Sequence, residues 1–307
     1  MTDTLIHTTS PQPFEYPSLS TRIASLIGVV IPFAGFIAAI VLLWGRGFGW
    51  LEGGLLLSMY VLTAVGVTVG YHRYFCHRSF QTHRAVQCAL AIMGSMAWEG
   101  NMLKWVAMHR CHHQHSDGEG DPHSPNEHGD GVLAVLRGMW HAHIGWIFLG
   151  DPKNLYHYVQ DLSSDRLLRG ISKLWLVWAF IGAAIPAAVA GLITMSWMDA
   201  LMGFMWGGLA RVFLVHHVTW SINSVCHLWG TRPFKSHDRS RNNFLFGVVG
   251  LGEGWHNNHH AFPTSARHGL RWWELDISYW IIRTLGLFGL AWSIKVPSSD
   301  RVSAQLA

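Results

Sequence analysis

Charged residues are scarce in this sequence. Only 13% of the 307 residues are Asp, Glu, Lys or Arg, against 50% from the apolar set, and the mean hydropathy is +0.21. Soluble globular proteins carry roughly 25% charged residues, and disordered chains are poor in apolar ones. The composition therefore excludes a disordered chain and favours an integral membrane protein. With 22 Lys and Arg against 18 Asp and Glu, the basic excess is too small to indicate a nucleic-acid partner.

Closely paired cysteines are also absent. The four cysteines show no CxxC spacing, which argues against a disulfide framework and against a zinc ribbon. They are Cys76, Cys88, Cys111 and Cys226. We therefore expect a reduced compartment. No segment recurs with a period of about 20 to 50 residues, so a repeat architecture is not supported.

Four runs are apolar and long enough to cross a bilayer, which takes about 20 residues. They cover residues 24–43, 53–71, 174–197 and 200–220. Short connections join them in pairs, so we predict an all-α integral membrane fold with two transmembrane hairpins. A polar tail, 1–22, precedes the membrane domain, 23–293, and a tail, 294–307, follows it. The first span is expected to be an uncleaved anchor because its apolar run is longer than that of a signal peptide.

One further uncharged segment, residues 85–98, is too short to span the bilayer. It separates two histidine clusters that must meet at one site, so we expect it at the interface or re-entrant. Only Arg46 lies in a hairpin turn and only Arg211 within a span, which leaves 20 basic residues on the face that carries the termini. By the positive-inside tendency, that face, the termini and a helical cap are predicted to be cytoplasmic.

Histidine is unusually frequent, with 21 residues. His109, His112 and His113 have the spacing i, i+3, i+4, which places them on one helical face, and the same spacing recurs about 145 residues later at His256, His259 and His260. A solvated helix has no physical reason to repeat that pattern. The duplication therefore predicts a histidine-rich site for two metal ions.

Three more histidines complete the expected set. His72 and His77 follow the second span, although residues i and i+5 lie about 140° apart on an ideal α-helix, so both can face the site only if the helix ends there. His227 lies one turn beyond Asn223, at the end of the fourth span. Nine imidazoles suffice for two metals with an open position for oxygen or water, but imidazole alone does not select the metal.

The remaining histidines are expected to be structural or to lie beside the ligands. His216 and His217 lie roughly 15 Å before His227 along the same helix, too far to join its site. His268 is also expected to be structural, with His7, His83, His128, His157 and His237, while His115, His123, His141 and His143 are assigned a structural or supporting role.

A carboxylate-bridged di-iron site is the competing reading. Such bundles use two Glu-x-x-His units, and only one, Glu253 with His256, exists here. Asp117, Glu119 and Asp121 follow the second cluster closely. We expect Asp117, Asp121 and Glu253 to accept the outer N–H of ligating imidazoles and so fix their tautomers.

Four motifs together carry a family resemblance: HRYFCHR, HRCHH, NSVCH and WHNNHHAFP, in that order around the two hairpins. The segment from Tyr71 to Pro263 resembles the membrane fatty acyl desaturases of the stearoyl-CoA (delta-9) type, in a bacterial-like form, while the flanks match in hydropathy only. The resemblance implies an oxygen-dependent enzyme that introduces a cis double bond into a saturated acyl chain. It also implies two iron ions (Fe2+) and a separate electron-transfer protein, ferredoxin-like or of cytochrome b type.

The resemblance further assigns roles to individual residues. One iron would be held by His72, His77, His109, His113 and His259. The other would be held by His112, His227, His256 and His260, with Asn223 acting through water. Trp105, Thr219 and Trp220 match positions that line the bend of the acyl tunnel.

The sequence departs from the animal acyl-CoA enzymes at Ala107 and Met108, where those enzymes have an Arg-Asp pair whose Arg contacts the CoA headgroup. The acyl carrier is therefore either CoA or a membrane glycerolipid. No haem-binding extension is visible, so the electron donor is expected to be separate. A hydroxylase with the same metal site is the alternative function, and a metal transporter is a third, although a transporter should place its ligands at bilayer depth.

Two sets of basic residues remain to be interpreted. Arg211, a charge within a span, is expected to pair with Glu52 or Glu99, to bound the far end of the tunnel, or to be structural. Six basic residues flank the last histidine cluster and are suited either to an acidic electron carrier or to anionic lipid headgroups. They are Arg232, Lys235, Arg239, Arg241, Arg267 and Arg271.

Overall fold

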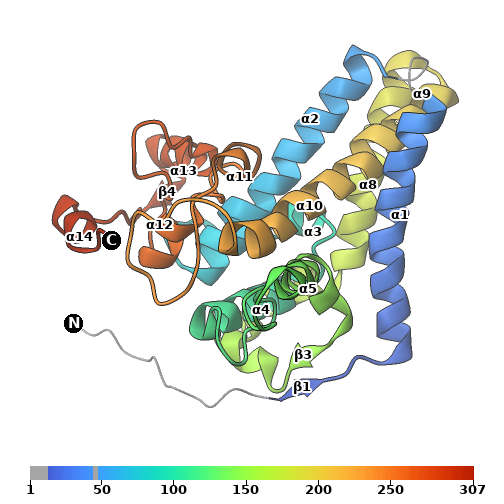
Figure 1. Ribbon diagram of the computed structural model, residues 1–307. Helices are drawn as coiled ribbons and strands as arrows, with labels where there is room; N and C mark the ends of the chain where they lie inside the picture. The colour runs from blue at the N-terminus through green and yellow to red at the C-terminus, as the bar shows by residue number, and fades with distance from the viewer. Residues whose placement is uncertain (1–12, 44–47) are drawn as a thin grey trace.

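The computed structural model describes residues 13–43 and 48–307 and is mostly helical (Figure 1). Within these described ranges, strands are confined to two antiparallel pairs of two residues each. β1 (Phe14–Glu15) pairs with β3 (Asp151–Pro152), and β2 (Gln81–Thr82) pairs with β4 (Ala291–Trp292). Residues 1–12 of the expected N-terminal tail lie outside the described part of the chain. The rest of that tail is ordered, because β1 is paired and the first helix already begins at Leu19.

In the described part of the chain, four helices are long and apolar enough to cross a membrane: Leu19–Val41, Trp50–Cys76, Trp175–Thr194 and Trp197–His227. The first lies in α1 (Leu19–Leu43) and the third is α8 (Trp175–Thr194). The second joins α2 (Trp50–Val65) to a π-helical segment, η1 (Gly66–Cys76). The fourth joins α9 (Trp197–Gly203), η4 (Phe204–Ala210), α10 (Arg211–Ser224) and η5 (Val225–His227). The second and fourth helices run five and seven residues past the expected ends, 71 and 220, and the extensions carry histidines.

The surfaces of these helices suit a lipid environment. In the most apolar 18-residue stretch of α1, only 17% is buried within the protein, and in that of α8 only 28% is buried. Large apolar side chains such as Val41 and Phe180 are exposed there. Apolar surface on this scale is unfavourable in water and is expected where hydrocarbon surrounds a helix.

α3 (Arg84–Ser95) is the uncharged segment that is too short to span, and it crosses η1 at very close range. A Cβ atom added to Gly66 would lie 2.2 Å from the backbone nitrogen of Gly94, and one added to Gly94 would lie 2.4 Å from the ring of Tyr71. Small residues permit such close helix contacts in membrane proteins. The chain then turns at Trp98, which has a positive φ of 63°.

Arg211 is fully buried and interacts with backbone carbonyls, which corrects the expectation of a pairing with Glu52 or Glu99. Its guanidinium donates to the carbonyl oxygens of Gly207 (3.2 Å), Met96 (2.8 Å) and Gly182 (3.0 Å). The carbonyl of Gly182 is free because residue i+4 is Pro186, which has no N–H. The arginine thus satisfies a carbonyl that the proline leaves without its helical partner.

The remaining helices lie around the ends of η1 and η5 that carry the histidines. They are α4 (Met102–His115), α5 (Val132–His143), η2 (Gly145–Phe148), η3 (Leu155–Val159), α6 (Gln160–Ser163), α7 (Arg166–Lys173), α11 (Phe244–Val249), α12 (His256–Ala261), α13 (Ile277–Leu287) and α14 (Ser299–Ala304). The expected C-terminal tail, 294–307, contains α14 and is attached by backbone hydrogen bonds from Lys235 to Gln305 and from Ala307 to Pro233.

Candidate metal centre

The first histidine pair lies on η1, and the π-helical winding explains how both side chains reach one site. The backbone N–H of His77 donates to the carbonyl of His72, five residues earlier (3.2 Å). Residues i and i+5 lie closer to the same side in this wider turn than in an α-helix. The two ring centroids are 4.8 Å apart. The helix also ends here, at Cys76.

The two HxxHH motifs lie on separate helices, α4 and α12. α4 begins with Asn101 as its N-cap, whose side chain accepts from the backbone N–H of Lys104. α12 is fully buried, and its two asparagines point away from the histidines: Asn257 donates to the carbonyl of Phe234 (3.1 Å) and Asn258 donates to Glu274 (2.8 Å). These bonds fix the orientation of α12.

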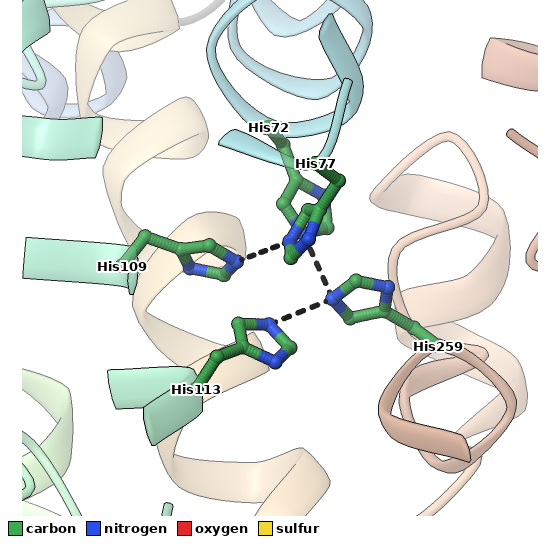
Figure 2. A group of neighbouring side chains, drawn as sticks. All are labelled: His72, His77, His109, His113 and His259. Atoms are coloured by element: carbon green, nitrogen blue, oxygen red, sulfur yellow. Dashed lines mark hydrogen bonds between the residues drawn. The ribbon is translucent and has the colours of Figure 1, made fainter. Parts of the chain in front are cut away.

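Five histidines converge from η1, α4 and α12 (Figure 2). The Nε2 atom of His259 lies 3.0 Å from that of His72 and 2.9 Å from that of His113, and the Nε2 atoms of His77 and His109 are 3.0 Å apart. One ligand atom from each of the five lies within 4.8 Å of the others. The imidazoles therefore face one another through the nitrogens that bind metals.

Four more histidines form a second group from α4, η5 and α12. The Nε2 atom of His256 lies 2.9 Å from that of His227 and 3.1 Å from that of His260. His112 completes the group, and its buried Nε2 atom has no hydrogen-bond partner among the described residues. The two groups contain the same residues as the two sets that the family resemblance implied.

Carboxylates contact four of these imidazoles on the opposite ring nitrogen, Nδ1. The pairs are His72 with Glu253 (2.5 Å), His112 with Asp121 (3.0 Å), His227 with Asp117 (2.8 Å) and His260 with Asp238 (2.5 Å). A carboxylate that accepts from Nδ1–H fixes the tautomer and leaves Nε2 available to a metal. Glu119, which follows the second histidine cluster with Asp117 and Asp121, is exposed.

Burial keeps three imidazoles of the first group neutral, whereas in the second group the adjacent Asp121 outweighs burial and raises the pKa of His112. Burial lowers the pKa of His77, His109 and His113 well below the usual value, because a charged ring would lose its hydration. Burial alone would raise the pKa of Asp121, but the adjacent His112 outweighs it and holds that pKa below its ordinary value. Neutral imidazole is the form that coordinates a metal.

Nine convergent imidazoles thus suit two transition-metal ions better than a hydrogen-bonded histidine cluster. The Nδ1 protons of His227 and His260 are committed to carboxylates, so both Nε2 atoms are acceptors, and the single Nε2 proton of His256 can satisfy only one of them. Two bound cations would satisfy the inward-facing nitrogens together. Iron is among the metals that accept imidazole ligands.

A cavity lies directly beside both groups, between the second and fourth long helices. Its lining includes His72, His109 and His256 together with apolar residues such as Val67 and Val215. Of the residues expected at the acyl tunnel, Trp105 and Thr219 line this cavity, and so does Asn223.

Trp220 differs from that expectation. It is not among the lining residues described, and its ring packs on His216 (4.9 Å between centroids) and near His143 (5.9 Å). The residues of this helix that line the cavity are Val215, Val218, Thr219, Ile222 and Asn223. At about 100° per residue, Trp220 points well away from the centre of that arc.

Sequence reasoning missed several residues around the site. Asp238, which holds His260, lies in the connection between the fourth helix and α12, 11 residues after His227 and 22 before His260, and belongs to none of the histidine motifs. His268 was assigned a structural role, yet its ring lies 4.5 Å from that of His259 and its Nδ1 atom lies 3.4 Å from Glu253. His123 was expected to have a structural or supporting role, and its ring centroid lies 4.4 Å from that of His112.

Arg73 was overlooked as well. It is completely buried and pairs with Glu253 (3.0 Å) and Asp276 (2.8 Å). Its position next to His72 in the HRYFCHR motif was the only available signal.

Comparison with known proteins agrees with this arrangement. The profile of the family described as fatty acid desaturase matches residues 48–293. The chain belongs to the fatty acid desaturase family. Desaturases are oxidoreductases, so the expected family and enzyme class are confirmed, and four membrane-crossing helices fit a membrane desaturase.

Named relatives differ in substrate. The chain is 44% identical over 278 residues to the hex-5-enoyl-[acyl-carrier protein] acetylenase of Moorena producens, covering 90% of this chain and 87% of that protein. It is 36% identical over 252 residues to the sn-1 stearoyl-lipid 9-desaturase of Anabaena variabilis, covering 81% and 86%. It is 35% identical over 276 residues to Delta-9 acyl-lipid desaturase 1 of Arabidopsis thaliana, covering 90% and 86%.

Proposed function

We propose that this desaturase uses oxygen and two iron ions to introduce a cis double bond into a saturated fatty acyl chain at the delta-9 position. The observation that carries the proposal is the pair of histidine groups at the wall of an apolar cavity. The stearoyl-lipid 9-desaturase and the delta-9 acyl-lipid desaturase among the relatives support the position of the double bond.

No side-chain acid, base or nucleophile removes hydrogen from an unactivated methylene, so the protein requires a cofactor. Bound irons would supply oxygen reduction and hydrogen abstraction. In the overall reaction, two hydrogens from adjacent carbons, two electrons and two protons reduce one oxygen molecule to two waters, and a carbon–carbon double bond remains. The two electrons require a separate redox protein, of ferredoxin or cytochrome b type.

The chain's own residues bind and position the reactants. His72, His77, His109, His113 and His259 would hold one iron, and His112, His227, His256 and His260 the other. Asn223, one helical turn before His227, would hold a metal-bound water. Asp117, Asp121 and Glu253 would orient the imidazoles that they contact.

The cavity would hold the acyl chain against the metal centre. Trp105 stacks on the ring of His109 (5.2 Å, 17°) and donates through its indole N–H to Glu99 (3.3 Å). Thr219 stands on the opposite helix. These rigid side chains would fix which carbons lie nearest the irons, which is how a positioned substrate gains selectivity.

The acyl carrier is inferred to be a membrane glycerolipid. Ala107 and Met108 supply no cation at the position where animal acyl-CoA enzymes bind the CoA headgroup. Two of the relatives described are named for acyl-lipid substrates. A substrate that stays in the bilayer also suits an active site beside the membrane.

The same proposal includes the topology. The four spans would form two hairpins, with the termini and a helical cap on the cytoplasmic side, because 20 of the 22 Lys and Arg residues lie outside the spans expected from the sequence and outside their hairpin turns. In Figure 1, α9 lies at one end of the long helices and α12 toward the other.

The test is gas chromatography with mass spectrometry of total fatty acids from a host that lacks its own desaturase. The host expresses either the intact chain or His112→Ala. A new monounsaturated acid only with the intact chain is expected, and derivatisation of the double bond gives its position. Hydroxy acids would instead indicate the hydroxylase, and substantial product from the His112→Ala variant would overturn the metal assignment.

An acetylenase is the second candidate, because the relative at 44% identity carries that name. The two functions differ in the bond they produce and in the chain they accept. Feeding the same host short terminal alkenoic acids and analysing the products for a triple bond distinguishes them. An acetylenic product without any monounsaturated one would replace the delta-9 proposal.

A further inference from the structure

α5 buries its small residues and exposes its large apolar ones, the reverse of a helix on a water-soluble surface. Its buried positions are Ala134, Gly138 and Ala142. The exposed positions are 39 to 78% accessible and are Val132, Leu133, Val135, Leu136 and Trp140. Arg137 is exposed beside them. Most of the exposed residues share one arc of the helix, opposite the small ones.

The buried face of α5 is packed too tightly for the helix to rotate about its axis. A Cβ atom at Gly138 would lie 1.9 Å from the carbonyl oxygen of Pro125, so the helix rests directly on the loop that follows α4. At the end of α5, His143 contacts Ser224 (3.0 Å) and His217 (2.9 Å) on the fourth long helix. The exposed apolar arc is therefore a fixed feature of the fold.

α5 lies beside two of the long apolar helices. α5 packs against α10, and η2, which follows α5 directly, contacts α1. α1 itself exposes Ile23 and Ile27, each about half accessible. α5 is therefore placed next to helices whose exposed apolar surface suits lipid.

We propose that α5 is an in-plane membrane helix, which inserts Val132, Leu133, Leu136 and Trp140 into the interfacial layer of the bilayer. With 12 residues it is about 18 Å long, too short to cross a hydrocarbon core of about 30 Å. Tryptophan and arginine beside an aliphatic arc are typical of helices that lie at the interface, where the arginine reaches the headgroups.

This contact would bring the bilayer close to the metal centre. The loop beneath α5 contains Asp121, which holds His112, and His123, which packs on the same ring. Lipid on the outer face of α5 thereby supports the loop on its inner face. The inference rests on the four spans and not on the proposed reaction.

Spin-label accessibility in reconstituted vesicles tests the proposal. Nitroxides are attached to the full-length protein at Leu133→Cys or Leu136→Cys, in a Cys88→Ser background because the other three cysteines are buried. Leu57→Cys on the second span is the lipid-facing control, and Ser303→Cys on α14 is the water-facing control; both positions are exposed. Collision rates with oxygen and with a water-soluble nickel chelate are compared.

We expect the α5 labels to collide several-fold more with oxygen than with the chelate, as at Leu57→Cys and unlike Ser303→Cys. Chelate collisions equal to those at Ser303→Cys would place α5 in water and overturn the proposal. Low collision rates with both reagents would indicate a protein partner or a second copy and would also overturn it. Retarded maleimide labelling of Leu136→Cys in intact vesicles provides a second readout if a labelled variant is unstable.

Discussion

At the scale of single residues, a carboxylate that fixes an imidazole contributes to metal affinity without touching the metal. Asp238 accepts from His260 and also receives hydrogen bonds from Ser240, and these two partners hold its pKa below the ordinary value although burial opposes this. The aspartate is therefore available as an ionised acceptor throughout the neutral pH range.

Asp238→Asn should lower iron affinity by about 10- to 100-fold, because an amide is a weaker acceptor for the Nδ1 proton. Iron per chain, measured by mass spectrometry of the purified protein after dialysis against a weak chelator, checks this. Asp300→Asn, an exposed acid on α14, is the control. Equal iron retention in both variants would remove Asp238 from the metal site.

Glu99 offers a test by pH. Burial raises its pKa to about 7, despite hydrogen bonds from Thr219 and Trp105 that lower it, and Oε1 has no partner among the described residues. In the unfolded chain this group ionises near the ordinary pKa of 4.5. Stability should therefore fall as pH rises from 4.5 to about 7 and level off above, since only the folded state keeps the proton.

Glu99→Gln should remove this pH dependence and raise stability at pH 8, by up to about 3 kcal/mol. Thermal unfolding in detergent at pH 5 and pH 8 measures the change, with Glu119→Gln, an exposed acid, as the control. If the Glu99→Gln variant unfolds with the same pH profile as the unaltered protein, the carboxyl does not titrate in this range.

At the scale of the elements, the histidine helices were predictable and the π-helix was not. The HxxHH spacing indicates a helix with its histidines on one face, so α4 and α12 could be predicted from the sequence. The five-residue spacing of His72 and His77 conflicts with α-helical geometry, and no local signal distinguished a widened turn from a simple helix end. Asp238 and His268 could not be assigned because only the tertiary fold brings them to the histidines.

The crossing of α3 and η1 depends on the absence of side chains. Gly94→Ala should destabilise the fold by about 1–3 kcal/mol, because the new Cβ atom meets the ring of Tyr71 at 2.4 Å. Gly28→Ala on α1 has nothing within 4 Å and should be neutral. Comparable unfolding temperatures for the two variants in detergent would contradict the close crossing.

Arg211 and Pro186 are predicted to be coupled. Arg211→Met should cost about 1–3 kcal/mol for each buried carbonyl left without a donor. In a Pro186→Ala background the loss should be smaller, because residue 186 then has an N–H for the carbonyl of Gly182. A thermal-unfolding double-mutant cycle measures this, and strictly additive effects would refute the coupling.

At the scale of the whole molecule, hydropathy located all four long helices, because a bilayer imposes a length and a composition on each span. It placed the ends of the second and fourth helices too early, at residues 71 and 220. These two helices continue into the metal centre, where polar residues replace apolar ones. The expected terminal tails also proved partly structured, as the contacts of β1 and α14 depend on distant segments.

The central claim is a centre of two irons held by nine histidines. The most direct measurement is the iron content per chain of the purified protein, compared with that of His77→Ala, which alters the first group, and of His227→Ala, which alters the second. The account predicts two irons in the unaltered protein and a loss of about one in each variant, with the protein still folded. Fewer than two irons in the fully loaded protein, or no loss in either variant, would contradict it.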